Sequence, residues 1–158
     1  MNDAKLVGIA QYATAKAPEQ LCCLGLGSCV GVFLYDPSTK IGGVVHALLP
    51  RAPNGSILEA KYADTGIRLL QRRTVTDGAF EHRIIAKLTG GAQMFKDLNL
   101  KMGDIGRQNV LQSRRTLGEL GISIVSEDVE GERGRSAYYS LGDGSVRVRK
   151  AFGSDIVI

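Results

Sequence analysis

The sequence lacks any apolar run of the roughly 20 residues that a membrane-spanning helix needs. Its first residues, MNDAKLVGIAQ, also lack the order of basic, apolar and small residues that marks a signal peptide. We therefore expect no membrane insertion and predict a cytoplasmic protein. The chain has no internal repeat, no low-complexity segment and no linker, so residues 1–158 are predicted to form one domain.

The sequence also lacks a block of basic residues and a row in which basic and aromatic residues alternate. It has 20 Lys and Arg against 16 Asp and Glu, and the net charge of +4 is spread over short pairs such as Arg72-Arg73 and Arg114-Arg115. Nucleic-acid binding is therefore not expected. A mildly basic surface fits an acidic protein partner equally well.

Cysteine is scarce, and its three residues all lie within one stretch, LCCLGLGSCV, at positions 21–30. An odd number cannot pair completely within one chain, and cytosolic reductants keep thiols free, so a structural disulfide is not expected. Cys22 and Cys23 are neighbours on a predicted strand and point to opposite faces, which argues against a zinc site. No metal or other cofactor is expected, and Cys22 is predicted to pack in the core.

The pattern of apolar residues predicts many strands and two long helices, which indicates an α/β fold with a sheet covered by helices. Two apolar runs around Asp36-Pro37-Ser38-Thr39 predict a hairpin at the centre of that sheet. The other predicted elements are strands at 5–13, 19–26, 82–88 and 122–129, helices at 59–73 and 104–120 with Asp104 as N-cap, and a hairpin of 137–141 with 145–150.

The register of the first hairpin decides which side chains meet. If Pro37 and Ser38 are the two central residues of its turn, facing positions sum to 75, and Cys29 lies opposite His46 with Cβ atoms about 4.5–5.5 Å apart. A bulge would shift this pairing and separate the two side chains. The opposite face of the hairpin then collects a coherent core of Val30, Val32, Leu34, Ile41 and Val45.

A thiol becomes a nucleophile when a neighbouring imidazole accepts its proton and stabilises the thiolate. The glycine-rich stretch GLGS before Cys29 offers backbone amides, including that of Cys29, to a developing oxyanion. However, free cysteines usually pack, and a lone histidine on an apolar strand is often a core residue. The residues alone leave both readings of Cys29 and His46 open, whereas His82 is predicted to lie on the surface.

Five sequence motifs occur along the chain in an order and at a spacing typical of one protein family: LGLGSCVGVFLYDPSTKIGGVVHALLP, KYADTGI, KLTGGAQMF, IGRQNV and GERGRS. From about Val7 to Lys150 the chain resembles the chemoreceptor glutamine deamidase family, CheD. The resemblance implies an α/β sandwich with a mixed, largely antiparallel sheet, similar to bacterial toxin deamidases. It also implies a protein-glutamine glutaminase that acts on methyl-accepting chemotaxis receptors, in some members also on glutamate methyl esters, with a CheC-type phosphatase or an archaeal adaptor as partner.

The resemblance also assigns the site. Cys29 would attack the glutamine carboxamide, His46 would act as base and then as acid, and Cys23 would be the third catalytic residue. The family usually has threonine at position 23; because a thiol is a poorer hydrogen-bond partner than a hydroxyl, His46 is held less firmly here or a backbone carbonyl takes over. The substrate-binding residues implied are Gly27, Ser28, Gly90 and Gly91.

Departures from the family pattern at Glu130, Glu132 and Arg107-Gln108 concern contacts with substrate or partner more than the fold. Two other functions stay open. One is a non-catalytic chemotaxis adaptor that binds the phosphatase. The other is a redox-responsive thiol protein in which Cys23 and Cys29 form a reversible disulfide.

Overall fold

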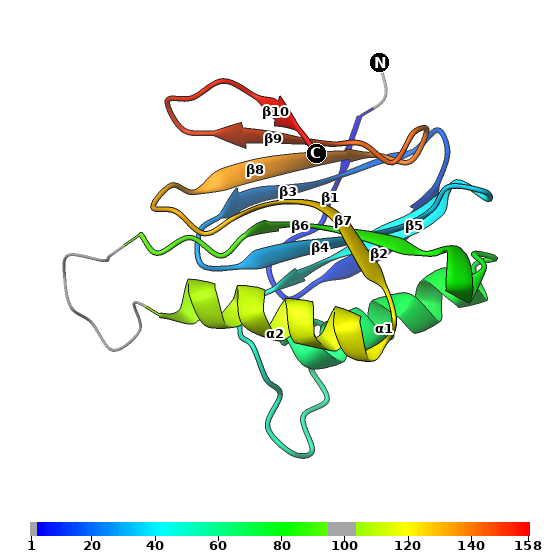
Figure 1. The fold of residues 1–158 in the computed structure, drawn as a ribbon, viewed down its shortest axis with the longest axis horizontal. Helices are drawn as coiled ribbons and strands as arrows, with labels where there is room; N and C mark the ends of the chain where they lie inside the picture. The colour runs from blue at the N-terminus through cyan, green and yellow to red at the C-terminus, as the bar shows by residue number, and fades with distance from the viewer. Residues whose placement is uncertain (1–2, 95–103) are drawn as a thin grey trace.

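The computed structural model describes residues 3–94 and 104–158, which form three layers: two five-stranded sheets face each other, and two helices cover the free face of one of them (Figure 1). The outer sheet has the order β1-β3-β8-β9-β10, with the bounds Lys5–Leu6, Gln20–Leu26, Arg135–Ser140, Val146–Lys150 and Ile156–Val157. The inner sheet has the order β2-β5-β4-β6-β7, with the bounds Tyr12–Lys16, Ile41–Ala47, Val30–Asp36, Ile85–Gly90 and Ser123–Val129.

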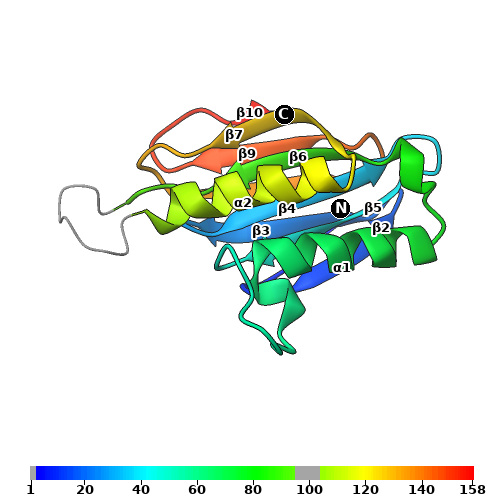
Figure 2. The ribbon, with the colours of Figure 1, turned by 60° about the horizontal axis from the view of Figure 1, so that its bottom comes forward.

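The helices lie side by side on the inner sheet, as Figure 2 shows. They are α1 (Ala63–Thr76) and α2 (Ile105–Glu119), and two short 3₁₀ turns, η1 (Glu59–Lys61) and η2 (Glu81–Arg83), precede α1 and β6. Asp104 is the N-cap residue of α2, as predicted, but its side chain makes no capping hydrogen bond. Neither helix in the described part of the chain has the length and apolarity needed to cross a membrane.

The α/β class is confirmed, with a mixed and largely antiparallel arrangement of strands. A second sheet covers the face of the inner sheet that no helix covers. The single strand predicted at residues 5–13 is wrong, because Ala10 has a left-handed φ of 63° and the chain reverses there. As a result β1 joins the outer sheet and β2 the inner one. The predicted turn beginning at Thr89 is described only up to Met94, so its last residue, Phe95, lies outside the described residues.

Alternate residues of β4 and β5 face two different cores. Val30, Val32 and Leu34 point to the helices, where they pack with Ile67 and Leu70, so the core predicted for that face is confirmed. The intervening residues fill the space between the sheets, in what we call the inter-sheet layer. Its buried members include Leu21, Cys23, Leu26, Cys29, Phe33, Tyr35, Val44 and Tyr139.

Tyr139 joins the two sheets. Its hydroxyl donates a hydrogen bond of 2.6 Å to the carbonyl oxygen of Leu34, and its ring meets the edge of Phe33 at 5.2 Å between centroids. Gly42 lies beside this contact, where a Cβ atom would come within 2.5 Å of the Tyr139 hydroxyl. The close approach of the sheets therefore requires glycine at position 42.

The β4–β5 hairpin has the predicted strands but a different register. Its loop contains four residues rather than two, from Pro37 to Lys40, and Lys40 takes a left-handed φ of 56° to close it. Asp36 pairs with Ile41 and Gly31 with His46, so facing positions sum to 77 and the predicted sum of 75 is wrong. Because the shift is two residues, each side chain keeps its predicted face.

Candidate active site

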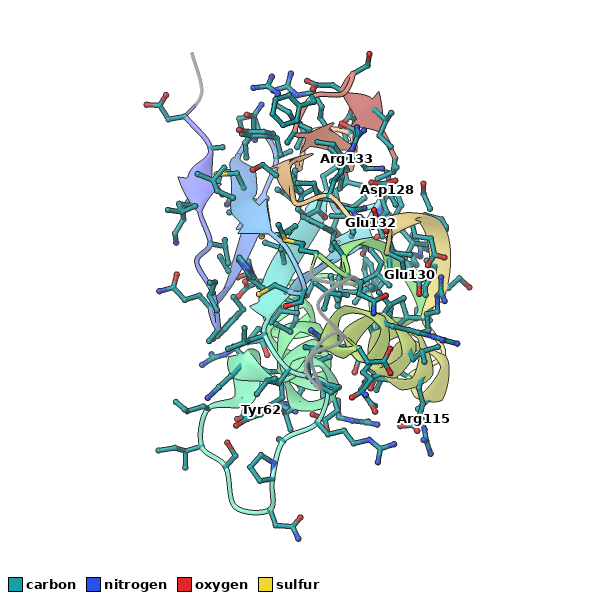
Figure 3. The ribbon with its side chains drawn as sticks, turned by 90° about the vertical axis from the view of Figure 1, so that its left-hand side faces the viewer. Tyr62, Arg115, Asp128, Glu130, Glu132 and Arg133 are labelled. Carbon is teal, nitrogen blue, oxygen red and sulfur yellow. The ribbon has the colours of Figure 1, made fainter. Side chains whose placement is uncertain are left out.

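A cleft of about 580 Å³ opens beside the loop between β3 and β4. It is lined by Gly25, Gly27, Ser28, Cys29, Leu48, Leu49, Lys61, Ala92, Gln93, Met94 and Ile105. Most of these are apolar or present backbone, and Lys61 is the one charged side chain among them. In Figure 3, which faces this end of the molecule, Tyr62 lies near the connection from β5 to α1, and Glu130, Glu132 and Arg133 lie on the β7–β8 connection above α2.

Cys29 lies in the wall of this cleft, directly before β4, with 5% of its surface exposed. The backbone around it is fixed by the chain that follows β6, since the amide of Gly91 donates to the carbonyl of Cys29 and the amide of Ala92 to that of Gly27, both at 2.8 Å. A Cβ atom on Gly90 would lie 2.3 Å from the Cys29 carbonyl oxygen. Gly27 lines the cleft, whereas Gly90 and Gly91 are not among its lining residues and instead pack against the backbone carbonyl of Cys29.

His46 on β5 is 1% exposed, and its Nδ1 lies 3.1 Å from the carbonyl oxygen of Val7. A carbonyl only accepts, so Nδ1 carries the hydrogen and Nε2 has the free lone pair. Burial lowers the pKa of His46, which favours this neutral form. Within the described residues Nε2 has no hydrogen-bond partner, and the imidazole is therefore ready to accept a proton there.

Cys29 and His46 are neighbours without a hydrogen bond between them. Since His46 faces Gly31, Cys29 is its diagonal neighbour, and a sheet typically places such residues about 7–8 Å apart, with their Cβ atoms somewhat closer. Burial raises the pKa of the Cys29 thiol, so both groups are neutral in this state. Catalytic contacts are often long in the absence of substrate and tighten when it binds.

Cys23 is completely buried in the inter-sheet layer, together with Cys29. Burial, reinforced by the neighbouring Cys22 and Cys29, raises the pKa of Cys23 to about 12. The carbonyl of Val7, and no group of Cys23, lies within hydrogen-bond distance of Nδ1 of His46 among the described residues. Cys22 lies outside the inter-sheet layer, on the other face of β3, as predicted.

Asn109 on α2 belongs to this site, and the sequence analysis did not identify it. Its side chain is completely buried, and Nδ2 donates to the carbonyls of Ser28 (2.8 Å) and Leu48 (3.0 Å). The sequence contained a signal, because this polar residue stands directly before Val110 on the apolar face of a predicted helix, within the stretch IGRQNV. An amide on the buried face of a helix calls for a specific partner.

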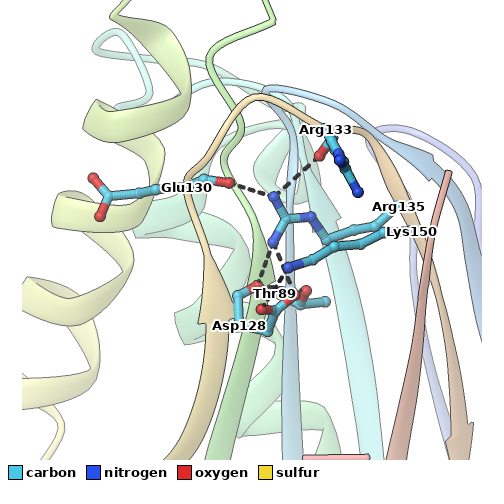
Figure 4. Close-up of polar contacts among 6 residues, drawn as sticks. All are labelled: Thr89, Asp128, Glu130, Arg133, Arg135 and Lys150. Carbon is cyan, nitrogen blue, oxygen red and sulfur yellow. Dashed lines mark hydrogen bonds and ion pairs between the residues drawn. The ribbon is translucent and has the colours of Figure 1, made fainter. Parts of the chain in front are cut away.

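The β7–β8 connection is held by a buried arginine, Arg135, whose side chain is 1% exposed (Figure 4). Its guanidinium donates to the carboxylate of Asp128 at 2.9 Å, and to the backbone carbonyls of Asp128, Glu130 and Arg133. Lys150 adds an ion pair of 3.0 Å with Asp128. Because Glu130 contributes its carbonyl and its carboxylate points away from Arg135 in Figure 4, its departure from the family pattern leaves this network intact.

The same connection supports the chain behind Cys29. The amide of Glu130 donates to the carbonyl of Gly90 at 2.9 Å, and the amide of Gln93 donates to the carbonyl of Gly131 at 2.8 Å. The guanidinium of Arg135 is thereby linked, through the β7–β8 connection and its backbone hydrogen bonds, to the segment that holds Cys29.

Comparison with known proteins gives one consistent result. A family model described as "CheD chemotactic sensory transduction" matches residues 48–150, a range that begins after both Cys29 and His46. A "Probable chemoreceptor glutamine deamidase CheD" of Pyrococcus abyssi is 45% identical over 155 residues, covering 96% of this chain and 94% of its own. Proteins with the same name from Archaeoglobus fulgidus and Desulforamulus reducens are 40% identical over 158 residues (100% of both chains) and 44% identical over 146 residues (90% and 88%).

Proposed function

The chain belongs to the CheD family, and on this premise we propose that it hydrolyses glutamine side chains of chemoreceptors to glutamate, with Cys29 as nucleophile and His46 as general base. One observation carries the proposal: a buried, neutral imidazole, whose Nε2 has no partner in residues 3–94 and 104–158, lies diagonally across the sheet from a thiol in the wall of a cleft.

The groups present account for each step of the reaction. Nε2 of His46 takes the proton of the Cys29 thiol, and the thiolate attacks the carboxamide carbon of the substrate. The imidazolium then protonates the departing nitrogen, ammonia leaves, and a thioester remains. A water molecule that gives a proton to Nε2 attacks this thioester, the Cys29 sulfur leaves with that proton, and glutamate is released.

The environment supports this chemistry. The Gly27–Cys29 segment lines the cleft, and we expect its backbone amides to donate to the developing oxyanion, each such donor contributing on the order of 3 kcal/mol to the transition state. We expect a bound substrate to displace water from this largely apolar cleft, which would strengthen these contacts. The carbonyl of Val7 holds the ring in the required tautomer, so a hydroxyl at position 23 is not needed for that purpose.

Cytoplasmic chemoreceptor segments are the proposed substrates, and a CheC-type phosphatase or an archaeal adaptor is the proposed regulatory partner. Neither a catalytic role for Cys23 nor a reversible Cys23–Cys29 disulfide is needed for this mechanism, and both stay predictions.

The test is the mass of receptor fragments after incubation with the protein. Each deamidated glutamine gains about one dalton, and Cys29→Ala should abolish that gain because it removes the nucleophile. Cys22→Ala is the matched control: it removes an equally small buried thiol from the other face of β3, and its activity should persist. If receptor mass never changes while the phosphatase still binds, the protein is an adaptor and not a deamidase.

A further inference from the structure

Asn109 stands where helix α2 crosses the end of the β4–β5 ladder. The last pair of that ladder is Val30 with Ala47, so Ser28 and Leu48 lie just beyond it. The two hydrogens on Nδ2 of Asn109 go to the carbonyls of these two residues, at 2.8 and 3.0 Å. One side chain from the helix layer thus joins two strand ends that the sheet itself no longer connects.

The two strand ends are those that carry the chemistry. Ser28 directly precedes Cys29, and Leu48 follows His46 by two residues. On its other side the Cys29 segment is bonded to the chain after β6, through Gly91. Without Asn109, no hydrogen bond among the described residues would tie the Cys29 segment to the strand of His46 beyond the ladder.

The oxygen of the Asn109 side-chain amide indicates that this residue does more than stabilise the fold. Oδ1 of Asn109 is buried and has no hydrogen-bond partner among the described residues. An unpaired buried acceptor is unfavourable for folding, so the side chain is poorly explained as a stabilising group alone. Asparagine is the short neutral side chain that offers two N–H donors on one atom.

We propose that Asn109 is a positioning residue that fixes the separation between Cys29 and His46, an inference that rests on the proposed function of this pair. By holding both carbonyls, it keeps the thiol within the short movement that brings Sγ to Nε2 of His46. Displacing reacting groups by about 1 Å can cost about 100-fold in rate. Loss of the two donors is therefore expected to lower kcat for deamidation by about that factor.

Asn109→Asp is the sharpest variant, because it keeps the shape of the side chain and removes both donors. Asn109→Ala removes the whole amide, and Asn109→Ser keeps a single donor. Thr116→Ala is the matched control: Thr116 is equally buried on α2 and its hydroxyl accepts a hydrogen bond from Gln112, but no hydrogen bond among the described residues joins its side chain to either strand end.

The decisive measurement is the rate at which iodoacetamide alkylates Cys29 as a function of pH, followed by peptide mass spectrometry so that the three cysteines are separated. It needs no receptor. In the wild type, His46 shapes this pH profile; in Asn109→Asp and Asn109→Ala the profile should move toward that of His46→Gln, while Thr116→Ala should keep the wild-type profile.

Each outcome decides the matter. A wild-type alkylation profile and wild-type kcat in Asn109→Asp would overturn the positioning role, even if Cys29→Ala is inactive and the proposed function therefore holds. If the Asp and Ala variants do not fold, Asn109→Ser decides instead: an intermediate profile supports the proposal, and an unchanged profile rejects it. Deamidation by Cys29→Ala would instead reject Cys29 as the nucleophile, and with it the pair that Asn109 is proposed to position.

Discussion

The two ends of the β4–β5 hairpin each bury a titratable side chain, Asp36 at the turn and His46 at the open end, and the hydrogen bonding of these two side chains differs. At the turn, Asp36 accepts hydrogen bonds from the amides of Ser38 and Phe80, both at 2.8 Å, and from the Ser38 hydroxyl at 2.7 Å. At the other end, Nε2 of His46 and Oδ1 of Asn109 are buried without a partner among the described residues. Both ends belong to the same two strands, so burial alone does not distinguish them.

The difference separates structure from chemistry. A satisfied buried carboxylate stabilises the folded state, and the hydrogen bonds to Asp36 lower its pKa to about 2 although burial opposes this. An unsatisfied buried nitrogen costs stability, and such groups deserve a functional explanation. The turn end thus holds the hairpin together, and the open end keeps the capacity to accept a proton.

Replacing the base should give the largest effect. His46→Gln keeps a polar side chain of similar reach but cannot accept and return a proton, so the rate of deamidation should fall by about 100- to 10,000-fold. Receptor mass measured over time gives this rate, and circular dichroism checks the fold. A variant that folds and still works at the wild-type rate would remove His46 from the mechanism.

At the turn end the expected effect is on stability only. Asp36→Asn removes the negative charge of a carboxylate that accepts three hydrogen bonds. Because hydrogen bonds to a charged group contribute about 1.5–3 kcal/mol, the free energy of unfolding should fall by about that amount. Urea denaturation measures it. Activity per folded molecule should stay unchanged, and a selective loss of activity would show that the two ends are coupled.

The two ends should also respond to acid in separate pH ranges. Burial lowers the pKa of His46, so its contribution to stability is present above about pH 6.5 and is lost as the pH falls below that value. The pKa of Asp36 is lowered to about 2, so its contribution is lost between about pH 3.8 and 2. In urea denaturation at several pH values, His46→Gln should flatten the first range and Asp36→Asn the second. A loss confined to one range in both variants would contradict this separation.

The smallest effect is expected at position 23. Because the Val7 carbonyl already orients the His46 ring, Cys23→Thr should change the deamidation rate by less than about threefold, or under about 0.7 kcal/mol of barrier. A much larger gain would mean that a hydroxyl there does what the carbonyl does not. Cys23→Ala, which supplies no hydrogen-bonding group, is the control.

Local sequence patterns predicted most of the elements well. The alternation in β4 and β5, the Asp-Pro-Ser-Thr turn and the spacing of apolar residues in α1 are local signals, and each produced the expected strand or helix. Where a reversal depended on one unusual backbone angle the prediction failed. The left-handed Ala10 splits the first strand between two sheets, and the left-handed Lys40 lengthens the hairpin loop.

The sequence by itself determined which residues of each hairpin strand share a face, because side chains alternate along a strand. It placed Cys29 and His46 on one face only if no bulge shifted the register by one residue, and its motifs indicated the family. Only the tertiary structure decided the rest. It fixed the hairpin register, in which the numbers of facing residues sum to 77, and it brought the Val7 carbonyl to Nδ1 of His46. It also placed the Asn109 amide within hydrogen-bond distance of both strand ends. These contacts join residues far apart in the chain, and no local pattern encodes such distances.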